Sequence, residues 1–499
     1  MSPSVPLPRA ALCLTVLALF GWTPGASAQV KNWPSEGPPK AMANRSFKFP
    51  PYQIRTLPNG LQVVVVEHHE QPAITVKLLI RAGMAQDPAG KVGVANLVMT
   101  LLDQGSAAHT ARQFAEAVDN LGAASGTAAG TDVSFAYVTV MKDSFSSGLD
   151  LLSEMVRSPA FPMEELERQR SQVLSALTVG YEEPGYVARM VFERLVYGLH
   201  PYAFPGNGTP DSVARITRDD LLRFHQMYFA PNNAMLAVVG DVAVDEAVAM
   251  TQKVFGAWAR QTVPAVVRQG TPPPARRVVV IDKPDAVQTA IRVGHLAMPR
   301  KTPDYLAADL AVRILGGEGG NRLQRVLRVE RGLTYAAGAD LEVFEQTGHI
   351  MAETDTRSAS TAEVLRLMVD EFYRLQQQPV EARELADAKA YLAGNYPLTI
   401  ETPDAIATHV LNSLFYGLPL DELQTFRERV GAVQAEDVQR VSRYYLLPDK
   451  LSIVLVGNAS AFLDSLKSAG FKNVDVIRLA DVDIDSPDLR RKAPAGQAR

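Results

Sequence analysis

Histidine is a common ligand of catalytic metal ions, and the chain contains eight histidines. Their spacing does not form a zinc motif, because no two lie four positions apart and no H-E-x-x-H occurs. The densest cluster is His68-His69-Glu70, at the end of a strand-like stretch. Adjacent side chains on a strand point to opposite faces, so this cluster is interpreted as a solvated strand end. Histidine spacing alone therefore gives no reason to expect zinc chemistry.

A glycine-rich turn and the helix after it mark a position where a metal site could lie. The turn spans residues 80–83 and 87–95, and apolar residues then recur at helical spacing. This framework resembles that of the pitrilysin/insulinase metallopeptidases, whose helix at this place carries H-x-x-E-H. The resemblance places Asn96 and Thr100 at the two histidine positions and Met99 at the glutamate position. An amide, a hydroxyl and a thioether supply neither two imidazole ligands nor a general base.

The third zinc ligand in that family is a glutamate on a later helix. The matching helix here begins near Glu167, and the ligand position falls on Ala176, whose neighbours are not acidic. Three ligands and the base are therefore all missing. We expect no metal and no other cofactor in this chain.

The second half contains an arginine and a tyrosine within a recognisable run. A glycine-rich loop at residues 315–323 precedes residues 327–335, which read L-R-V-E-R-G-L-T-Y. The run resembles the C-terminal-domain motif of the same family, in which an arginine and a tyrosine seven positions apart anchor the substrate. Arg328 and Tyr335 have that spacing. The resemblance implies a catalytic role for this pair and a substrate-binding role for the loop glycines, which are Gly316, Gly317, Gly319 and Gly320.

These two residue types suit the implied role, because hydrolysis of a peptide bond builds negative charge on the carbonyl oxygen. A guanidinium stays charged and donates parallel hydrogen bonds, and a phenol adds a further donor. Taken singly, Arg328 would be a surface arginine and Tyr335 a tyrosine at a core edge. Their occurrence together in a matching run favours function. The loop lacks the G-K-[ST] ending of a nucleotide-binding loop, so a flexible or closely approaching backbone is expected.

Composition describes an ordinary globular chain. Of its 499 residues, 47% are hydrophobic and 21% are charged, with 50 Lys and Arg against 54 Asp and Glu. There is no run rich in lysine and arginine, so nucleic acid is not an expected partner.

The N-terminus has the layout of a secretory signal peptide. Arg9 precedes an apolar run, and Ala26-Ser27-Ala28 is a small-x-small cleavage site, so residues 1–28 are predicted to be removed. The apolar run is too short for a membrane span, and none is expected after cleavage. The single cysteine, Cys13, lies within it. We expect a periplasmic protein without disulfides.

The remaining chain is predicted to form two similar domains by internal duplication. Tyr228 and Tyr445 are 217 positions apart, as are Gly240 and Gly457, and each tyrosine is followed by a proline and an apolar strand. The expected class is α+β, with two pitrilysin/insulinase-like domains, each a mostly antiparallel sheet covered by helices. The predicted segments are an extended lead-in at 29–47, an N-terminal domain at 48–261, a Pro-rich linker at 262–276, a C-terminal domain at 277–480 and a polar tail at 481–499.

These features together predict the non-catalytic subunit of a secreted heterodimeric zinc endopeptidase. The expected partner is a homologous chain that carries the zinc, in a heterodimer or a dimer of heterodimers, and the expected substrate is an unfolded peptide. The alternative is an inert scaffold or peptide-binding protein of the same fold. A third hypothesis, an independent peptidase with a relocated metal, has the least support, because the histidine spacing offers no such site.

Overall fold

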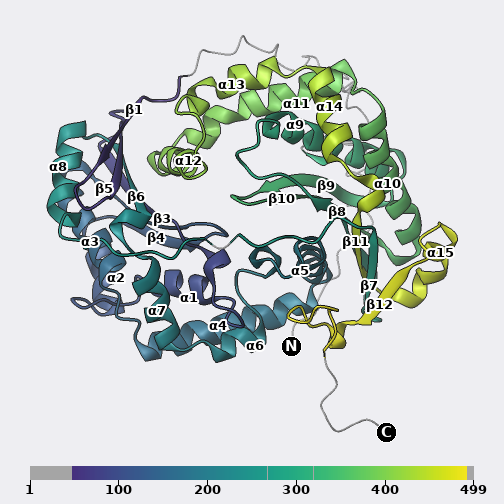
Figure 1. The fold of residues 1–499 in the computed structure, drawn as a ribbon, viewed down its shortest axis with the longest axis horizontal. Helices are drawn as coiled ribbons and strands as arrows, with labels where there is room; N and C mark the ends of the chain where they lie inside the picture. The colour runs from purple at the N-terminus through teal and green to yellow at the C-terminus, as the bar shows by residue number, and fades with distance from the viewer. Residues whose placement is uncertain (1–47, 267, 318–319, 492–499) are drawn as a thin grey trace, which may run out of the picture. The chain divides into compact units, whose positions relative to one another are not determined.

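The computed structural model describes residues 48–266, 268–317 and 320–491. The predicted signal peptide and the lead-in at 29–47 lie outside these residues. The described chain contains two six-stranded sheets, one in each half of the sequence (Figure 1).

The sheet of the first half has the strand order β1-β2-β6-β3-β5-β4. Strands β2 and β6 are parallel, and the other neighbours are antiparallel. The strands are β1 Tyr52–Thr56, β2 Gln62–Glu67, β3 Ala73–Ile80, β4 Ala124–Ala129, β5 Ser134–Met141 and β6 Ala234–Gly240. The helices of this half are α1 Val94–Leu101, α2 Ala111–Asn120, α3 Phe145–Arg157, α4 Met163–Glu182, α5 Pro184–Tyr197, α6 Pro210–Arg215, α7 Arg218–Tyr228 and α8 Val244–Phe255.

The sheet of the second half has the order β12-β7-β11-β8-β10-β9. Its strands are β7 Arg277–Asp282, β8 Gln288–Leu296, β9 Thr334–Val343, β10 Gly348–Arg357, β11 Ser452–Gly457 and β12 Val474–Arg478. Here β7 is parallel to both β11 and β12, so both sheets are mixed but mostly antiparallel. The helices are α9 Tyr305–Gly316, α10 Thr361–Gln377, α11 Ala382–Asn395, α12 Pro403–Phe415, α13 Glu422–Ala432, α14 Ala435–Tyr445 and α15 Leu463–Ser468, with a π-helix, η5, at Gln324–Glu330.

The two halves repeat one another element by element, which supports the predicted duplication. Helices α7 and α14 are offset by 217 positions at both ends, and strands β6 and β11 end at Gly240 and Gly457. Five strands follow the same order in each sheet, and the outermost strand differs, since β1 precedes its neighbour in sequence and β12 comes from the chain's end. Strand β1 was not predicted, because this short edge strand is largely exposed and holds only two partly buried residues, Tyr52 and Ile54.

The strands β6 and β11 are almost entirely apolar because both faces of each sheet are covered. Strands β6 and β11 are buried at every position. A strand that is buried on both faces reads as a continuous apolar run rather than an alternating one. One face of each sheet packs on helices of its own half. The opposite face of each sheet is covered by a helix of the other half.

Helix α5 of the first half covers the other face of the second sheet. It packs on β8 and β11, and eight of its apolar side chains are buried there or against neighbouring segments (Figure 1). Phe192 is fully buried in this layer, with Met351 and Val454 of the second half. Complete burial of one such side chain stabilises the folded state by about 1.5–3 kcal/mol. The first half therefore completes the core of the second.

Helix α12 of the second half makes the reciprocal contact with the first sheet. It packs on β3 and β6, with Val410 and Leu411 fully buried. A buried lysine fixes it in place: Lys77 of β3 donates to both carboxylate oxygens of Asp404, at 2.9 and 3.0 Å, and to the Thr408 hydroxyl at 2.7 Å. Exchange of α5 and α12 makes the two halves mutually dependent.

Two of the predicted boundaries can be compared with the structure. Between α8 and β7 the described residues form neither helix nor strand, where the Pro-rich linker was expected. The predicted polar tail at 481–499 is different: its first part packs into the core, with Val482, Ile484 and Leu489 buried. Arg194 of α5 donates to the Ile484 carbonyl at 2.7 Å. The start of the predicted tail is therefore part of the fold, because it packs against α5. The polar sequence of the tail does not reveal this contact with a distant helix. Residues 492–499 lie outside the described range.

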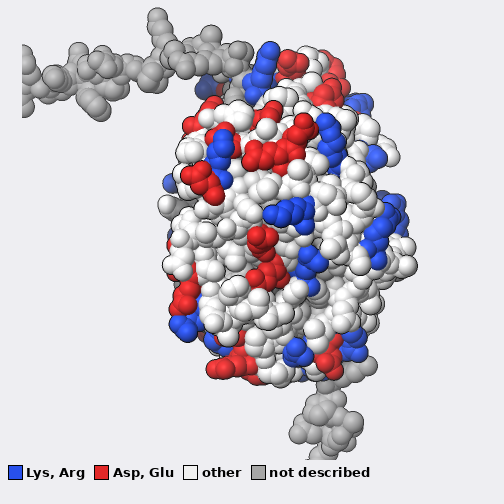
Figure 2. Space-filling model, turned by 90° about the vertical axis from the view of Figure 1, so that its left-hand side faces the viewer, with Lys and Arg blue, Asp and Glu red and all other residues white. Residues whose placement is uncertain are grey.

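No helix among the described residues is long and apolar enough to cross a membrane. Figure 2 shows one face of the molecule, on which lysine and arginine side chains are interspersed with aspartate and glutamate. On this face the described residues form no continuous basic area of the kind that nucleic-acid binding requires.

Candidate functional site

The turn that precedes α1 is anchored by two charged side chains, Asp87 and Lys91. The Asp87 carboxylate accepts hydrogen bonds from the backbone N–H groups of Gly93, at 2.6 Å, and Ala95, at 2.7 Å, at the start of the helix. A carboxylate at a helix N-terminus satisfies free N–H donors and is favoured by the helix dipole. The turn is thereby fixed to the first turn of α1.

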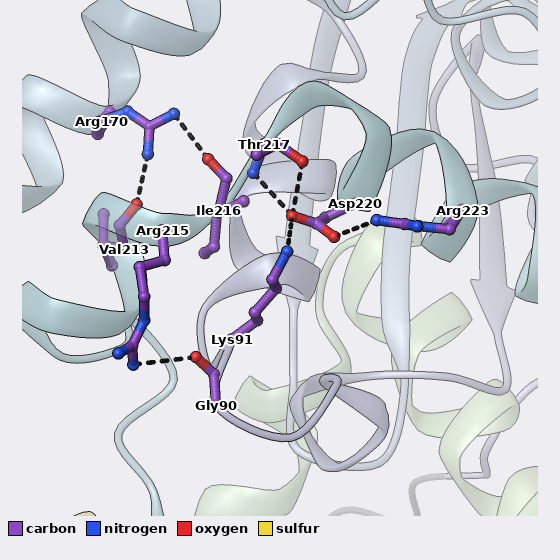
Figure 3. A network of polar contacts seen from close by, with 9 residues as sticks. All are labelled: Gly90, Lys91, Arg170, Val213, Arg215, Ile216, Thr217, Asp220 and Arg223. Carbon is purple, nitrogen blue, oxygen red and sulfur yellow. Dashed lines mark hydrogen bonds and ion pairs between the residues drawn. The ribbon is translucent and has the colours of Figure 1, made fainter.

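Lys91 anchors the same turn to α7, as Figure 3 shows. Its ammonium pairs with the buried carboxylate of Asp220, which also accepts from the Thr217 N–H at 2.8 Å and from Arg223 at 2.6 Å. Burial raises the pKa of Asp220, but the hydrogen bonds from Lys91, Thr217 and Arg223 outweigh burial and hold that pKa well below its ordinary value. The turn before α1 is thus held both to the start of α1 and to α7.

The positions that would bear metal ligands are occupied by side chains with other roles. Met99 is buried in the core, and the Thr100 hydroxyl donates to the Asn96 carbonyl of its own helix at 2.7 Å. Ala176 lies exposed on α4, which packs against α1. None of the four is an imidazole, thiolate or carboxylate, the ligands that zinc takes. This helix pair has kept its packing and has no zinc-ligand set.

Arg328 and Tyr335 lie together, as the run at 327–335 predicted. The Arg328 guanidinium carbon is 5.0 Å from the centroid of the Tyr335 ring, a cation–π distance. Arg328 belongs to η5 and Tyr335 to β9, the edge strand of the second sheet. Tyr335 is 84% exposed. A charged fork and a phenol are therefore presented side by side to the outside of the fold.

Arg328 differs from the other arginines of its segment. Each of those pairs with a glutamate, whereas the Arg328 guanidinium makes no hydrogen bond or ion pair with a residue in the described part of the chain. The shortest nitrogen–oxygen distances are 2.7 Å for Arg322–Glu384, 3.1 Å for Arg325–Glu330 and 3.9 Å for Arg331–Glu363. The Tyr335 hydroxyl likewise bonds to no described residue, so the donors of both groups face outward.

The glycine at position 332 explains how the pair comes together. Gly332 has φ +61°, and its N–H donates to the Arg328 carbonyl at 3.0 Å, which ends the helix. A left-handed residue is the usual helix terminator, and glycine adopts it without steric cost. The chain then turns directly into β9, so Tyr335 returns past Arg328. The π-helical form of η5 was not predicted; such wide turns often occur at functional sites.

Glycine is structurally required at several positions of the glycine-rich loop, and at Gly317 a Cβ atom would lie 2.8 Å from the Cα atom of Arg313. Gly316 ends α9 against β9, where a Cβ atom would lie 2.3 Å from the Ala339 nitrogen. Gly316 thus allows close approach of a helix and a strand. Gly320 has φ +101° with no atom within 4 Å of its would-be Cβ, and Gly319 lies outside the described residues. Substrate binding by Gly316, Gly317, Gly319 and Gly320 stays a prediction.

One cluster of chemically capable residues was missed by the sequence analysis. Glu193, Glu342 and His349 place one ligand atom each within 4.8 Å of one another, and they are the described group of this kind that could hold a metal ion. Burial raises the pKa of Glu193 to about 8 and lowers the pKa of His349 to about 3. Glu342 and His349 meet across two adjacent strands, but Glu193 lies far away in sequence, so no spacing motif reveals the group.

Comparison with known proteins agrees with the geometry. A model described as "Insulinase (Peptidase family M16)" matches residues 62–202, and one described as "Peptidase M16 inactive domain" matches residues 215–392. The solved structure of a peptidase M16 inactive domain from Pseudomonas fluorescens is 30% identical with a TM-score of 0.76, covering 81% of this chain and 98% of that one. The chain belongs to peptidase family M16.

Two curated relatives within M16 differ in how they are described. An uncharacterised zinc protease of Mycobacterium leprae is 26% identical over 351 residues, which is 69% of this chain and 78% of the relative. A non-peptidase homologue of Helicobacter pylori is 23% identical over 406 residues, which is 79% of this chain and 91% of the relative. Given the missing zinc ligands, the comparisons support a non-catalytic M16 protein.

Proposed function

We propose that this chain is the non-catalytic subunit of a heterodimeric zinc endopeptidase and supplies Arg328 and Tyr335 to the active site of its partner. The observation that carries the proposal is the Arg328 guanidinium, which pairs with no described residue and lies 5.0 Å from the ring of the exposed Tyr335. An exposed arginine without an acidic neighbour contributes little to stability, whereas a substrate oxygen would satisfy it.

The pair acts by hydrogen bonding rather than by bond making. As water attacks a peptide carbonyl, negative charge grows on the carbonyl oxygen. Arg328 donates from a planar, permanently charged fork, and Tyr335 donates from its hydroxyl on a stiff ring. The zinc of the partner would activate the attacking water. This chain orients the substrate and stabilises the developing oxyanion.

The edge position of β9 supports a peptide substrate. One side of β9 pairs with β10, and among the described strands none pairs with its other side. An unpaired edge can add an extended peptide as a further strand through backbone hydrogen bonds. A peptide bound there would run directly past Tyr335. This arrangement requires an unfolded segment, which agrees with the predicted substrate.

The proposed partner is a homologous M16 chain that carries H-x-x-E-H, since the ligand positions here hold Asn96, Met99, Thr100 and Ala176. We place the complex in the periplasm on the basis of the signal-peptide layout at residues 1–28. The alternative is an inert scaffold of the same fold. The missing zinc ligands support this alternative equally well, but it assigns no function to Arg328 and Tyr335.

The proposal is tested by reconstitution with an H-x-x-E-H chain encoded next to this one. Complex formation is followed by size-exclusion chromatography, and cleavage of an unstructured fluorogenic peptide is followed with the partner alone, this chain alone and the mixture. We expect activity in the mixture and none from this chain. Arg331→Lys is the matched control, because Arg331 is in the same segment but pairs with Glu363. Full activity of the partner alone would contradict the proposal.

A further inference from the structure

The cluster of Glu193, Glu342 and His349 lies where the first half packs on the second. Glu193 is on α5, whereas Glu342 and His349 face each other in register on β9 and β10. The His349 Nε2 atom is 3.5 Å from a carboxylate oxygen of Glu342, and a Glu193 oxygen completes a group within 4.8 Å. Ligands about 2.0–2.1 Å from a tetrahedral ion are ~3.3 Å apart. Small side-chain movements would bring the three atoms to that spacing.

The imidazole of His349 is buried and incompletely satisfied. His349 is 1% exposed, and its Nε2 atom has no hydrogen-bond partner among the described residues. The other ring nitrogen, Nδ1, is 2.7 Å from the Tyr197 hydroxyl. A ligating histidine is normally held by a hydrogen bond at its second nitrogen, which fixes the ring orientation and the tautomer. Tyr197 provides that support and leaves Nε2 directed at the two carboxylates.

The two carboxylates also lack hydrogen-bond donors. No hydrogen bond from the described residues reaches Glu193 or Glu342, although the Glu193 side chain is only 19% exposed. The nearest cation, Arg189 of α5, is 3.8 Å from an oxygen of each, beyond hydrogen-bonding distance. Both carboxylates are partly exposed, Glu342 at 41%, so they stay accessible to a ligand from solvent. The buried atom without a partner among the described residues is Nε2 of His349, and such an atom is costly to leave unsatisfied.

The charge around the cluster points in the same direction. Asp340 on β9 adds a further carboxyl group that interacts with both Glu193 and Glu342, and among the described residues the one cation acting on both is the Arg189 guanidinium. Arg292 is directed at Glu353, at 3.1 Å, rather than at the cluster. A divalent cation would balance part of this excess negative charge.

We propose that Glu193, Glu342 and His349 form a binding site for one divalent transition-metal ion of the Zn²⁺ type. One imidazole and two carboxylates suit Zn²⁺ or Mn²⁺, whereas Mg²⁺ and Ca²⁺ prefer oxygen ligands alone. The site lies on helix α5 and the second sheet, not on α1, where the family's zinc motif would be. It is independent of the proposed role of Arg328 and Tyr335.

The site would act as a joint between the halves. An ion bound to Glu193 on one side and to Glu342 and His349 on the other would link α5 to β9 and β10, in addition to the Tyr197–His349 hydrogen bond and the Arg189 ion pairs. Because the three ligands come together only in the folded chain, metal binding stabilises the folded state. Metal would therefore strengthen the helix exchange.

The experiment uses the full mature chain, purified and stripped with EDTA. Isothermal titration with ZnCl₂ measures stoichiometry and affinity, and thermal unfolding is recorded with and without Zn²⁺. We expect one ion per chain and a higher Tm with Zn²⁺. Co²⁺ in place of Zn²⁺ should give visible d–d absorption from a mixed nitrogen and oxygen ligand set.

Variants assign the binding to these residues. Glu342→Gln is chosen first because its side chain is 41% exposed and the change preserves shape, so the chain should fold. We expect Glu342→Gln and Glu193→Gln each to lower Zn²⁺ affinity at least tenfold, since even outer-shell changes cost 10–100-fold, and to abolish the rise in Tm. Glu353→Gln, an acid on the same sheet but outside the cluster, is the control. Absence of stoichiometric Zn²⁺ binding, or equal affinity in Glu342→Gln and Glu353→Gln, would overturn the proposal.

Discussion

Replacement of Phe192 by alanine tests the exchange of helices between the halves. Phe192 lies in the sequence of the first half, but its fully buried ring packs on strands of the second and makes an edge contact with His349, with ring centroids 5.6 Å apart. A phenylalanine buries about 150–250 Å², which at ~25 cal/mol per Å² is about 4–6 kcal/mol. Measured Phe→Ala losses are about 3–5 kcal/mol. We therefore expect Phe192→Ala to lower the free energy of unfolding by about 4 kcal/mol.

The location of the effect matters as much as its size. Hydrogen exchange, measured in EDTA to exclude any metal contribution, should accelerate in β8 and β11, which contact α5. Leu199→Ala, just after α5 and 56% exposed, is the control and should change stability by less than about 0.5 kcal/mol. Faster exchange confined to residues 48–261, with β8 and β11 unchanged, would refute the exchange of helices.

Three further predictions follow from named contacts. Asp220→Asn should lower the free energy of unfolding by about 2 kcal/mol, because hydrogen bonds to a charged carboxylate are lost. Asp437, at the duplicated position, accepts from the N-cap backbone of α14, and Asp437→Asn should cost about 0.5–1 kcal/mol. Urea unfolding measures both values. Because the pKa of Asp220 is lowered in the folded chain, the stabilisation by its carboxylate is complete at neutral pH and is lost as the pH falls below about 4. If the acid-unfolding profiles of wild type and Asp220→Asn coincide, this prediction is contradicted. Asp404→Ala removes the carboxylate that pairs with the buried ammonium of Lys77, which keeps the Thr408 hydroxyl and the faces of the Phe135 and Tyr137 rings. The loss should be about 2–3 kcal/mol, less than the roughly 3–5 kcal/mol of a fully buried pair, because Asp404 is 39% exposed. Adding Lys77→Met should recover part of this loss in a double-mutant cycle, and strict additivity would refute the pairing. Gly332→Ala should lower the free energy of unfolding by about 1 kcal/mol, because alanine is strained at φ +61°. In the reconstituted complex the variant should also lower turnover, because Gly332 places Arg328 beside Tyr335. Wild-type turnover from this variant would contradict that role.

The sequence was informative wherever the determinants are local or repeated. The 217-residue offset between Tyr228 and Tyr445 predicted two equivalent halves, and α7 and α14 have that offset at both ends. The run at 327–335 singled out Arg328 and Tyr335, and a left-handed glycine two residues before β9 brings them together, while their joint action stays a prediction. Each inference depended on residues close in sequence or on an internal copy.

The remaining features depend on contacts between distant segments. Nothing local in α5 shows that it covers the second sheet, because an amphipathic helix does not specify which surface it packs on. The predicted polar tail joins the core through Ile484 and its bond to Arg194 for the same reason. Glu193, Glu342 and His349 form a group through β9–β10 pairing and α5 docking, which spacing motifs cannot detect.

The measurement that tests the central claim most directly is the turnover of the reconstituted complex with a doubly substituted chain. Tyr335→Phe keeps the ring, and Arg328→Lys keeps the charge but loses the planar fork, so both should fold and bind the partner. At matched complex concentration, loss of one oxyanion donor corresponds to roughly a hundred- to a thousandfold lower turnover. We predict that the double variant falls at least this far below wild type while Arg331→Lys keeps full activity. Wild-type turnover from the double variant would contradict a role in the partner's active site and would leave an inert scaffold as the function of this chain.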